Sequence, residues 1–185
     1  RGFSFRRDEP LDMRMDQSTG QTAADLIRNT SEQTLADIIF KYGEERQSRR
    51  IARAIVEARR TSPVTSTGDL ASIVRRSLRR KGYTRIDPAT RTFQAIRIWV
   101  NQELDGLEGV LEAMCRRLRT GARLVVISFH SLEDRIVKHT FRALERGGKV
   151  AIRVLTKRPV IPQDEEVERN PRARSAKLRV AERVA

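Results

Sequence analysis

The sequence predicts an α/β protein in which a long helical region precedes part of a sheet. Across residues 21–119, apolar side chains recur every three to four positions between capping residues and glycines, as in amphipathic helices. From residue 120 on, short apolar runs typical of strands alternate with one further helical pattern. The order helix, strand, helix, strand, strand is that of half an α/β sheet, and the pattern of an opening half is missing.

Short capping signals delimit the first helices. Thr30-Ser-Glu-Gln33 has the form of a capping box, which stabilises a helix start by about 1 kcal/mol, and Gly43 is expected to end that helix. A second helix is expected over about residues 44–60. A third begins at a cap that is either Ser66 or Thr67.

Asp87-Pro88 is typical of a helix start, since a carboxylate can cap the helix and Pro fits its first position. Gly106 and Gly109 are expected to divide the stretch that follows into two helices. The continuous apolar run 124–127 predicts a strand that is buried on both faces. A helix opening at Ser131, a strand over 150–155, a basic loop over 157–175 and a strand from 178 complete the pattern.

The composition favours a polyanionic partner. The chain has 185 residues, with 38 Lys and Arg against 24 Asp and Glu, giving a formal net charge of +14. Nucleic acid is the first candidate, and a soluble protein from a basic proteome is the alternative. Residues 61–100 are the most basic segment, with eight basic and two acidic side chains.

Other classes of protein are excluded by simple counts. Cys115 is the single cysteine, so an intrachain disulfide is impossible. No apolar run approaches the roughly 20 residues of a membrane span, and no signal peptide is visible. The chain starts with Arg1 rather than Met. We therefore expect a cytoplasmic protein that continues upstream.

Eight short motifs occur in order along almost the whole chain. They are Arg1-Gly-Phe-Ser-Phe5, Leu11-Asp-Met-Arg-Met-Asp16, Tyr42-Gly-Glu-Glu-Arg46, Arg49-Arg-Ile-Ala-Arg-Ala-Ile55, Pro88-Ala-Thr-Arg-Thr-Phe-Gln94, Ile98-Trp-Val-Asn101, Val126-Ile-Ser-Phe-His-Ser-Leu-Glu-Asp-Arg135 and Asn170-Pro-Arg-Ala-Arg-Ser175. Together they strongly resemble the ribosomal RNA small-subunit cytosine-N4 methyltransferase family, of the RsmH or MraW type. One departure is Asp87, where this family is expected to have His.

The resemblance implies a fold and a domain organisation. The chain would be the C-terminal half of a Rossmann-like class I methyltransferase sheet with an inserted all-helical domain. Residues 1–16 would be a loop of the methyltransferase domain, and residues 17–86 the inserted helical domain that recognises RNA. Residues 87–185 would form the C-terminal half of the Rossmann-like domain.

The resemblance also implies an activity: methylation of N4 of a cytidine in small-subunit (16S) ribosomal RNA with S-adenosylmethionine. The partner would be this RNA or the ribosomal subunit, with no DNA, membrane or metal involved. The family's glycine loop and acidic ribose ligand lie upstream of Arg1, so no cofactor-binding residue is expected in this chain, which should be inactive alone. A non-catalytic RNA-binding module and a helical adaptor are the alternatives.

Ser128 and His130 are the predicted catalytic residues. They follow the first strand, where open α/β sheets place their ligand crevice. His130 would orient the base or relay a proton from the exocyclic amine. Alternatively, it caps and packs the helix that follows.

The N-terminal loop holds five predicted substrate-binding residues. Phe3 and Phe5 would stack on a flipped base, or they belong to the core. Asp12, Arg14 and Asp16 form either a charged clamp on substrate or a structural ion-pair cluster that holds the loop.

Further predicted RNA contacts are basic or amide side chains. Arg49, Arg50 and Arg53 share one helix face, which would bind phosphates or be a solvated charged face. The remaining predicted contacts lie on the long helix and in the basic loop: Arg91, Asn101, Arg172 and Arg174. For the two loop arginines the alternative is a solvated turn.

Overall fold

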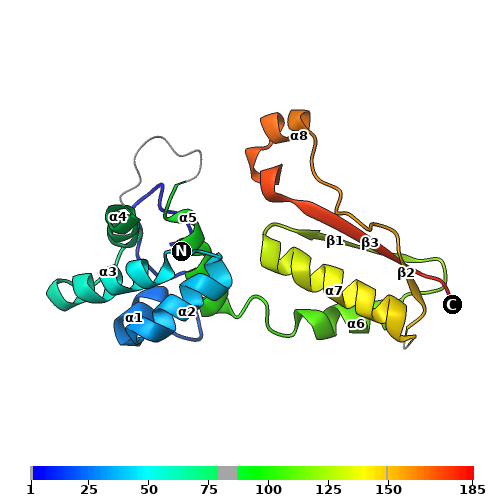
Figure 1. Cartoon of the computed structure of the whole chain (residues 1–185), viewed down its shortest axis with the longest axis horizontal. Helices are drawn as coiled ribbons and strands as arrows, with labels where there is room; N and C mark the ends of the chain where they lie inside the picture. The colour runs from blue at the N-terminus through cyan, green and yellow to red at the C-terminus, as the bar shows by residue number, and fades with distance from the viewer. Residues whose placement is uncertain (1, 79–86, 149) are drawn as a thin grey trace. The chain divides into compact units, whose positions relative to one another are not determined.

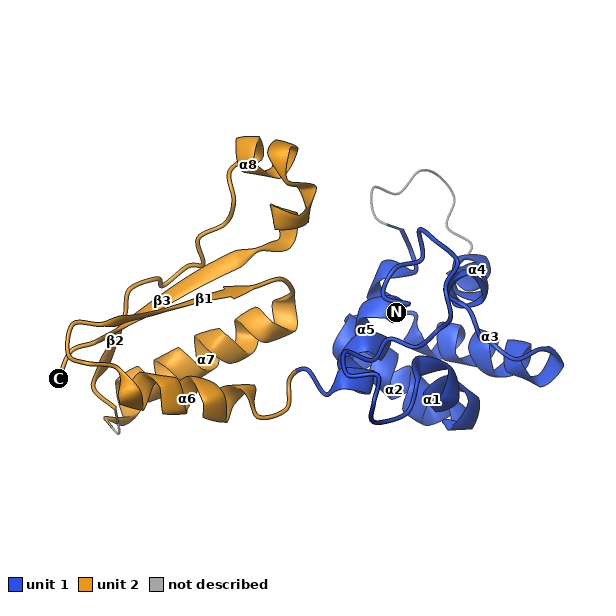
Figure 2. Cartoon of the chain, turned by 180° about the vertical axis from the view of Figure 1, so that it is seen from behind, with its two compact units in different colours: residues 1–103 blue, residues 104–185 orange. Residues whose placement is uncertain are grey.

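The computed structural model describes residues 2–78, 87–148 and 150–185 (Figure 1). The chain divides into two compact units, residues 1–103 and 104–185 (Figure 2). The described part of unit 1 consists of helices α1 (Ala23–Asn29), α2 (Glu32–Gly43), α3 (Ser48–Thr61), α4 (Thr67–Leu78) and α5 (Thr90–Asn101). No helix in the described ranges is long and apolar enough to span a bilayer.

Unit 2 is a mixed α/β structure, so the predicted α/β class is confirmed. Its elements are α6 (Leu107–Arg117), β1 (Arg123–Ser128), α7 (Ser131–Gly147), β2 (Ile152–Val154), α8 (Asp164–Arg169), the 3₁₀ helix η1 (Pro171–Ser175) and β3 (Lys177–Arg183). The predicted order of helix, strand, helix, strand and strand is therefore correct. Two short helices, α8 and η1, lie in the stretch that was expected to be a loop.

One apolar core holds unit 1 together. Helix α2 packs against α3 and α5, and α4 packs against α3. The predicted apolar faces are correct, because Leu35, Ile39, Ile51 and Ile55 are all fully buried. Burying such a side chain contributes about 1.5–3 kcal/mol. The N-terminal loop joins this core, and its Met13 has no exposed surface.

The first helix boundary lies one residue away from the predicted position. Helix α2 begins after Ser31, whose Oγ accepts the N–H of Thr34. Thr30 instead ends α1, where its hydroxyl donates to the carbonyl of Leu26. Adjacent Thr and Ser both have capping chemistry, so the sequence pattern alone does not separate the two registers.

Gly43 ends α2, as predicted. It is the last residue of α2, and the left-handed residue that follows is Glu44, with φ 50°. Glycine is required here because a Cβ would lie 2.6 Å from the carbonyl oxygen of Arg91. The missing side chain thus lets α2 approach α5 closely.

Gly43→Ala is expected to destabilise unit 1 by about 1–3 kcal/mol, because backbone must move to admit the methyl group. Gly109→Ala is the matched control. Gly109 lies inside α6 rather than between two helices, and nothing lies within 4 Å of its Cβ position. That variant should gain up to about 1 kcal/mol from helix propensity. Denaturant unfolding of both variants checks the pair, and a Gly43 variant as stable as wild type would contradict it.

The sheet of unit 2 has the order β1-β3-β2, with β3 antiparallel to both neighbours. Helices α6 and α7 lie on the same side of it (Figure 2). Leu124 and Val126 of β1 pack on that side, in a core built around Leu111, Val137 and Phe141.

The prediction that β1 is buried on both faces is wrong for this chain. Val125 and Ile127, on the other side of β1, are 52% and 55% exposed. The apolar run predicted a strand covered on both faces, but the described residues supply helices to one face only.

Candidate functional site

The turn between β1 and α7 is closed by a reciprocal cap. Nδ1 of His130 accepts the N–H of Glu133 at 3.3 Å. The Glu133 carboxylate accepts the N–H of Phe129 at 3.0 Å, and its other oxygen lies 3.4 Å from His130 Nε2. Of the two alternatives for His130, the structure shows the cap.

Two buried charged residues at this strand end were not singled out from the sequence. Arg179 of β3 donates to both oxygens of Asp134 in the first turn of α7, at 2.6 and 3.1 Å. Asp134 is 8% exposed and Arg179 is 5% exposed. Burial by itself raises the pKa of Asp134, but the hydrogen bonds and charge of Arg179 outweigh it, so this pKa lies below its usual value.

Further contacts link β1, β3 and α7 at this end of the sheet. Ser128, the last residue of β1, pairs in register with Lys177, and its hydroxyl donates to the Lys177 carbonyl at 3.4 Å. The Lys177 ammonium in turn lies 3.8 Å from Asp134. Ser128 is buried, so its backbone and hydroxyl are fixed at this strand end.

The predicted residues of the basic loop lie at the same end of unit 2. Both Arg172 and Arg174 are exposed side chains of η1, which leads directly into Lys177. Phe129, in the turn after β1, is 56% exposed and was not predicted. The structure therefore brings Ser128, His130 and the two arginines to one sheet end.

In unit 1, the two N-terminal phenylalanines pack against the core. The ring of Phe5 contacts Phe93 edge-on, with centroids 4.9 Å apart, and the guanidinium of Arg75 lies over Phe5 at 5.5 Å. Phe3 is partly buried on the same core. Both side chains therefore contact the core, and their stacking on a base stays a prediction.

The acidic and basic residues of the N-terminal loop bond within the loop itself. Arg14 binds Asp12 through two hydrogen bonds, of 2.7 and 3.0 Å. Asp16 accepts the N–H and hydroxyl of Ser18. The bonds from Arg14 lower the pKa of Asp12, and those from Ser18 lower the pKa of Asp16. The pair of Arg14 and Asp12 matches the structural alternative, while Asp16 bonds to Ser18 instead of joining an ion pair in the described residues.

Asn101 ties the same loop to the end of α5. Its amide nitrogen donates to the carbonyl of Met13 at 2.7 Å, and its amide oxygen accepts the N–H of Met15 at 2.7 Å. Met13 has a positive φ of 60°, which is uncommon for a residue other than glycine. The two hydrogen bonds from Asn101 thus stabilise the unusual backbone conformation at Met13.

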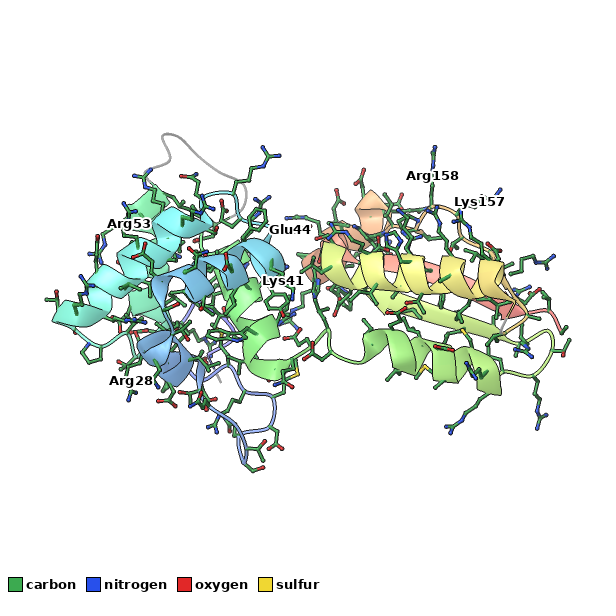
Figure 3. All side chains as sticks on the ribbon, turned by 60° about the horizontal axis from the view of Figure 1, so that its bottom comes forward. Arg28, Lys41, Glu44, Arg53, Lys157 and Arg158 are labelled. Carbon is green, nitrogen blue, oxygen red and sulfur yellow. The ribbon has the colours of Figure 1, made fainter. Side chains whose placement is uncertain are left out.

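The arginine side chains of the predicted face of α3 are exposed, and Figure 3 labels Arg53 among them. In the described residues, neither Arg49 nor Arg50 has an ion-pair partner, and Arg53 lies 3.6 Å from Glu32. Arg91 lies 3.8 Å from Glu45 and donates to the carbonyl of Glu44 at 3.3 Å, so it anchors the loop before α3. The exposed guanidinium groups of Arg49 and Arg50 are therefore available to bind a ligand.

The fold and these sites define an α/β protein with an attached basic helical unit and a polar strand-end site. The model of the MraW methylase family matches residues 1–184, and the chain belongs to this family.

Relatives share this similarity over nearly the whole chain. The ribosomal RNA small subunit methyltransferase H of Desulforapulum autotrophicum is 53% identical over 199 residues, which cover 100% of this chain and 64% of that protein. The protein of the same name from Acidobacterium capsulatum is 56% identical over 184 residues, covering 99% and 60%. That from Nitrobacter hamburgensis is 56% identical over 197 residues, covering 100% and 59%. The chain thus spans about three fifths of the length of these relatives.

Proposed function

We propose that this chain is part of a methyltransferase that uses S-adenosylmethionine to methylate N4 of a cytidine in small-subunit (16S) ribosomal RNA, in the cytoplasm. The family match over residues 1–184 carries the proposal, together with relatives named as small-subunit ribosomal RNA methyltransferases. The formal net charge of +14 and the exposed arginines of α3 suit a ribosomal RNA partner.

We infer that the methyl donor is not bound at the turn from β1 to α7. The turn from β1 to α7 contains no glycine, and side chains of His130 and Glu133 already bond its backbone amides. A glycine turn that binds such a cofactor needs free amides and close backbone approach. We therefore assign the donor site to chain outside residues 1–185, and expect no binding of S-adenosylmethionine by the isolated chain in calorimetry.

The strand-end residues are proposed to border the target base. The exocyclic amine of cytosine is a weak nucleophile, because its lone pair is delocalised into the ring. It has to be held in line with the methyl group and lose a proton late. His130 and Ser128 are the groups of this chain that we assign to holding the base and relaying that proton. The base has to leave its stack to reach them.

We further propose that the sheet is the C-terminal half of a Rossmann-like methyltransferase sheet, with residues 17–86 as the inserted helical domain. The exposed apolar side chains of Val125 and Ile127 support a sheet that further chain covers. The compact units part after Glu103, whereas the proposed boundary at 86 lies outside the described residues.

The proposed activity is tested with the full-length protein, small-subunit RNA and labelled S-adenosylmethionine. Mass spectrometry of the digested RNA should detect N4-methylcytidine. A methyl group on another base atom would contradict the cytosine-N4 assignment. Absence of RNA methylation by an enzyme that binds the donor would contradict the whole proposal.

A non-catalytic RNA-binding role for the isolated chain is the second candidate, and the exposed side chains of Arg49 and Arg50 favour it. If about four phosphates are neutralised, the logarithm of affinity should fall with that of salt at a slope of roughly −3. Replacing both arginines by Ala should flatten the slope by about one to two units, since these groups contact phosphates rather than bases.

The matched control for this salt dependence removes two other exposed arginines, Arg28 and Arg116, which pair with Asp25 and Glu112 on their own helices. It changes the net charge by the same amount. RNA titrations at several salt concentrations compare the two double variants. Equal flattening in both would mean that total charge, and not the α3 face, sets the affinity.

A further inference from the structure

Phe129 is an aromatic residue held on a rigid turn with its ring half exposed. Its N–H donates to Glu133, and the residues on either side, Ser128 and His130, are buried. The buried pair of Asp134 and Arg179 fixes the first turn of α7, which begins two residues after Phe129. The backbone that carries the ring is therefore ordered before any ligand arrives.

Exposed basic side chains lie at the same end of the sheet. Ser128 is in register with Lys177, so η1, which precedes Lys177, lies beside the turn that carries Phe129; both views of unit 2 agree (Figures 1 and 2). Ala173 is buried, and Asn170 caps η1 by accepting the N–H of Arg172. Within the described ranges, neither Arg172 nor Arg174 has an ion-pair partner, and both are exposed.

An ordered aromatic ring beside free guanidinium groups suits an unpaired nucleotide. Every base has a π face that stacks on such a ring, while arginines bind the flanking phosphates. We propose that this end of unit 2 binds a single-stranded RNA nucleotide, with Phe129 stacked on the base and Arg172 and Arg174 on its phosphates. The inference rests on the proposed RNA substrate and names a contact to it.

The competing explanation treats Phe129 as part of the apolar face that includes Val125 and Ile127, which are exposed to a similar degree. In that case another segment of the protein covers all three side chains. Stacking on a base and packing against protein predict opposite effects of substituting Phe129. Stacking needs an aromatic ring of any size, whereas a packed site tolerates Leu better than the larger Trp.

The test uses the full-length protein and two variants, Phe129→Leu and Phe129→Trp. Phe129→Leu should weaken binding of a single-stranded cytidine-containing RNA oligonucleotide and raise its KM by about 5- to 150-fold. Turnover at saturating RNA should change less. Phe129→Trp should restore both the affinity for the oligonucleotide and the KM. Affinity for the same sequence in a duplex should be unaffected. Melting temperature should stay within error for both variants.

Phe40→Leu is the matched control, since Phe40 is 60% exposed on α2 in unit 1. It should leave affinity for the oligonucleotide unchanged. A Leu variant of Phe129 with wild-type affinity, or a Trp variant that melts lower and restores nothing, would overturn the inference. Failure of the wild-type enzyme to bind or methylate RNA would instead overturn the proposed function.

Discussion

Asp134→Ala is expected to destabilise unit 2 by about 3–5 kcal/mol, because it leaves the guanidinium of Arg179 buried without its carboxylate. Arg179 is only 5% exposed and cannot recover its hydration without moving β3. The pair joins α7 to the middle strand of the sheet, so the loss should lower the unfolding midpoint of the whole unit. Denaturant unfolding measures the change.

A double variant separates the buried charge from the packing. Asp134→Leu with Arg179→Met replaces both partners by apolar groups, and such replacements are often neutral or stabilising. The double variant should therefore be much closer to wild type than Asp134→Ala. If the single variant lost less than about 1 kcal/mol, the pair would contribute little, as exposed pairs do.

The same pair predicts how the stability of unit 2 depends on pH. The pKa of Asp134 is lower in the folded chain than its value of about 3.9 in the unfolded chain. Its contribution to the free energy of unfolding is thus complete above the unfolded pKa and is lost as pH falls through the folded pKa. Stability of wild type should fall more steeply below about pH 4 than stability of Asp134→Asn. Parallel curves would contradict this linkage.

Helix faces could be predicted because they depend on local spacing. Ile51 and Ile55 repeat at helical intervals and both are buried as expected. Two other features depend on distant residues. Gly43 is required by the carbonyl of Arg91, and the exposed side of β1 depends on which elements cover it. Local pattern carries neither kind of information.

The sequence predicted where the candidate site lies better than it predicted the roles of the individual residues. The turn after the first strand was correctly placed, since a strand followed by a capped helix is a local pattern. Asp134 and Arg179 were overlooked because charged residues in amphipathic segments usually face solvent. Phe3 and Phe5 were candidates for stacking, whereas Phe129 has an exposed ring at the strand end. An aromatic residue's burial depends on the tertiary fold, which spacing does not encode.

His130→Asn is expected to lower turnover of the full-length enzyme by about 100-fold or more while leaving its stability unchanged. Asn is among the best capping residues, so it can still accept the N–H of Glu133 and keep the cap of α7. It has no imidazole, however, and cannot relay a proton, a role that contributes about 100- to 10,000-fold in enzymes.

His130→Ala should lose the same turnover and in addition about 1 kcal/mol of stability, because it removes the cap as well. Comparing the two variants therefore separates the chemical role proposed for His130 from the capping role that the structure shows. His139→Asn is the control: the chain's other histidine is exposed in the middle of α7, so its replacement should change neither quantity. Turnover at saturating RNA and thermal unfolding of all three variants complete the test. If His130→Asn turned over as fast as wild type, His130 would serve only to begin α7, and the proton acceptor would have to lie in another part of the protein.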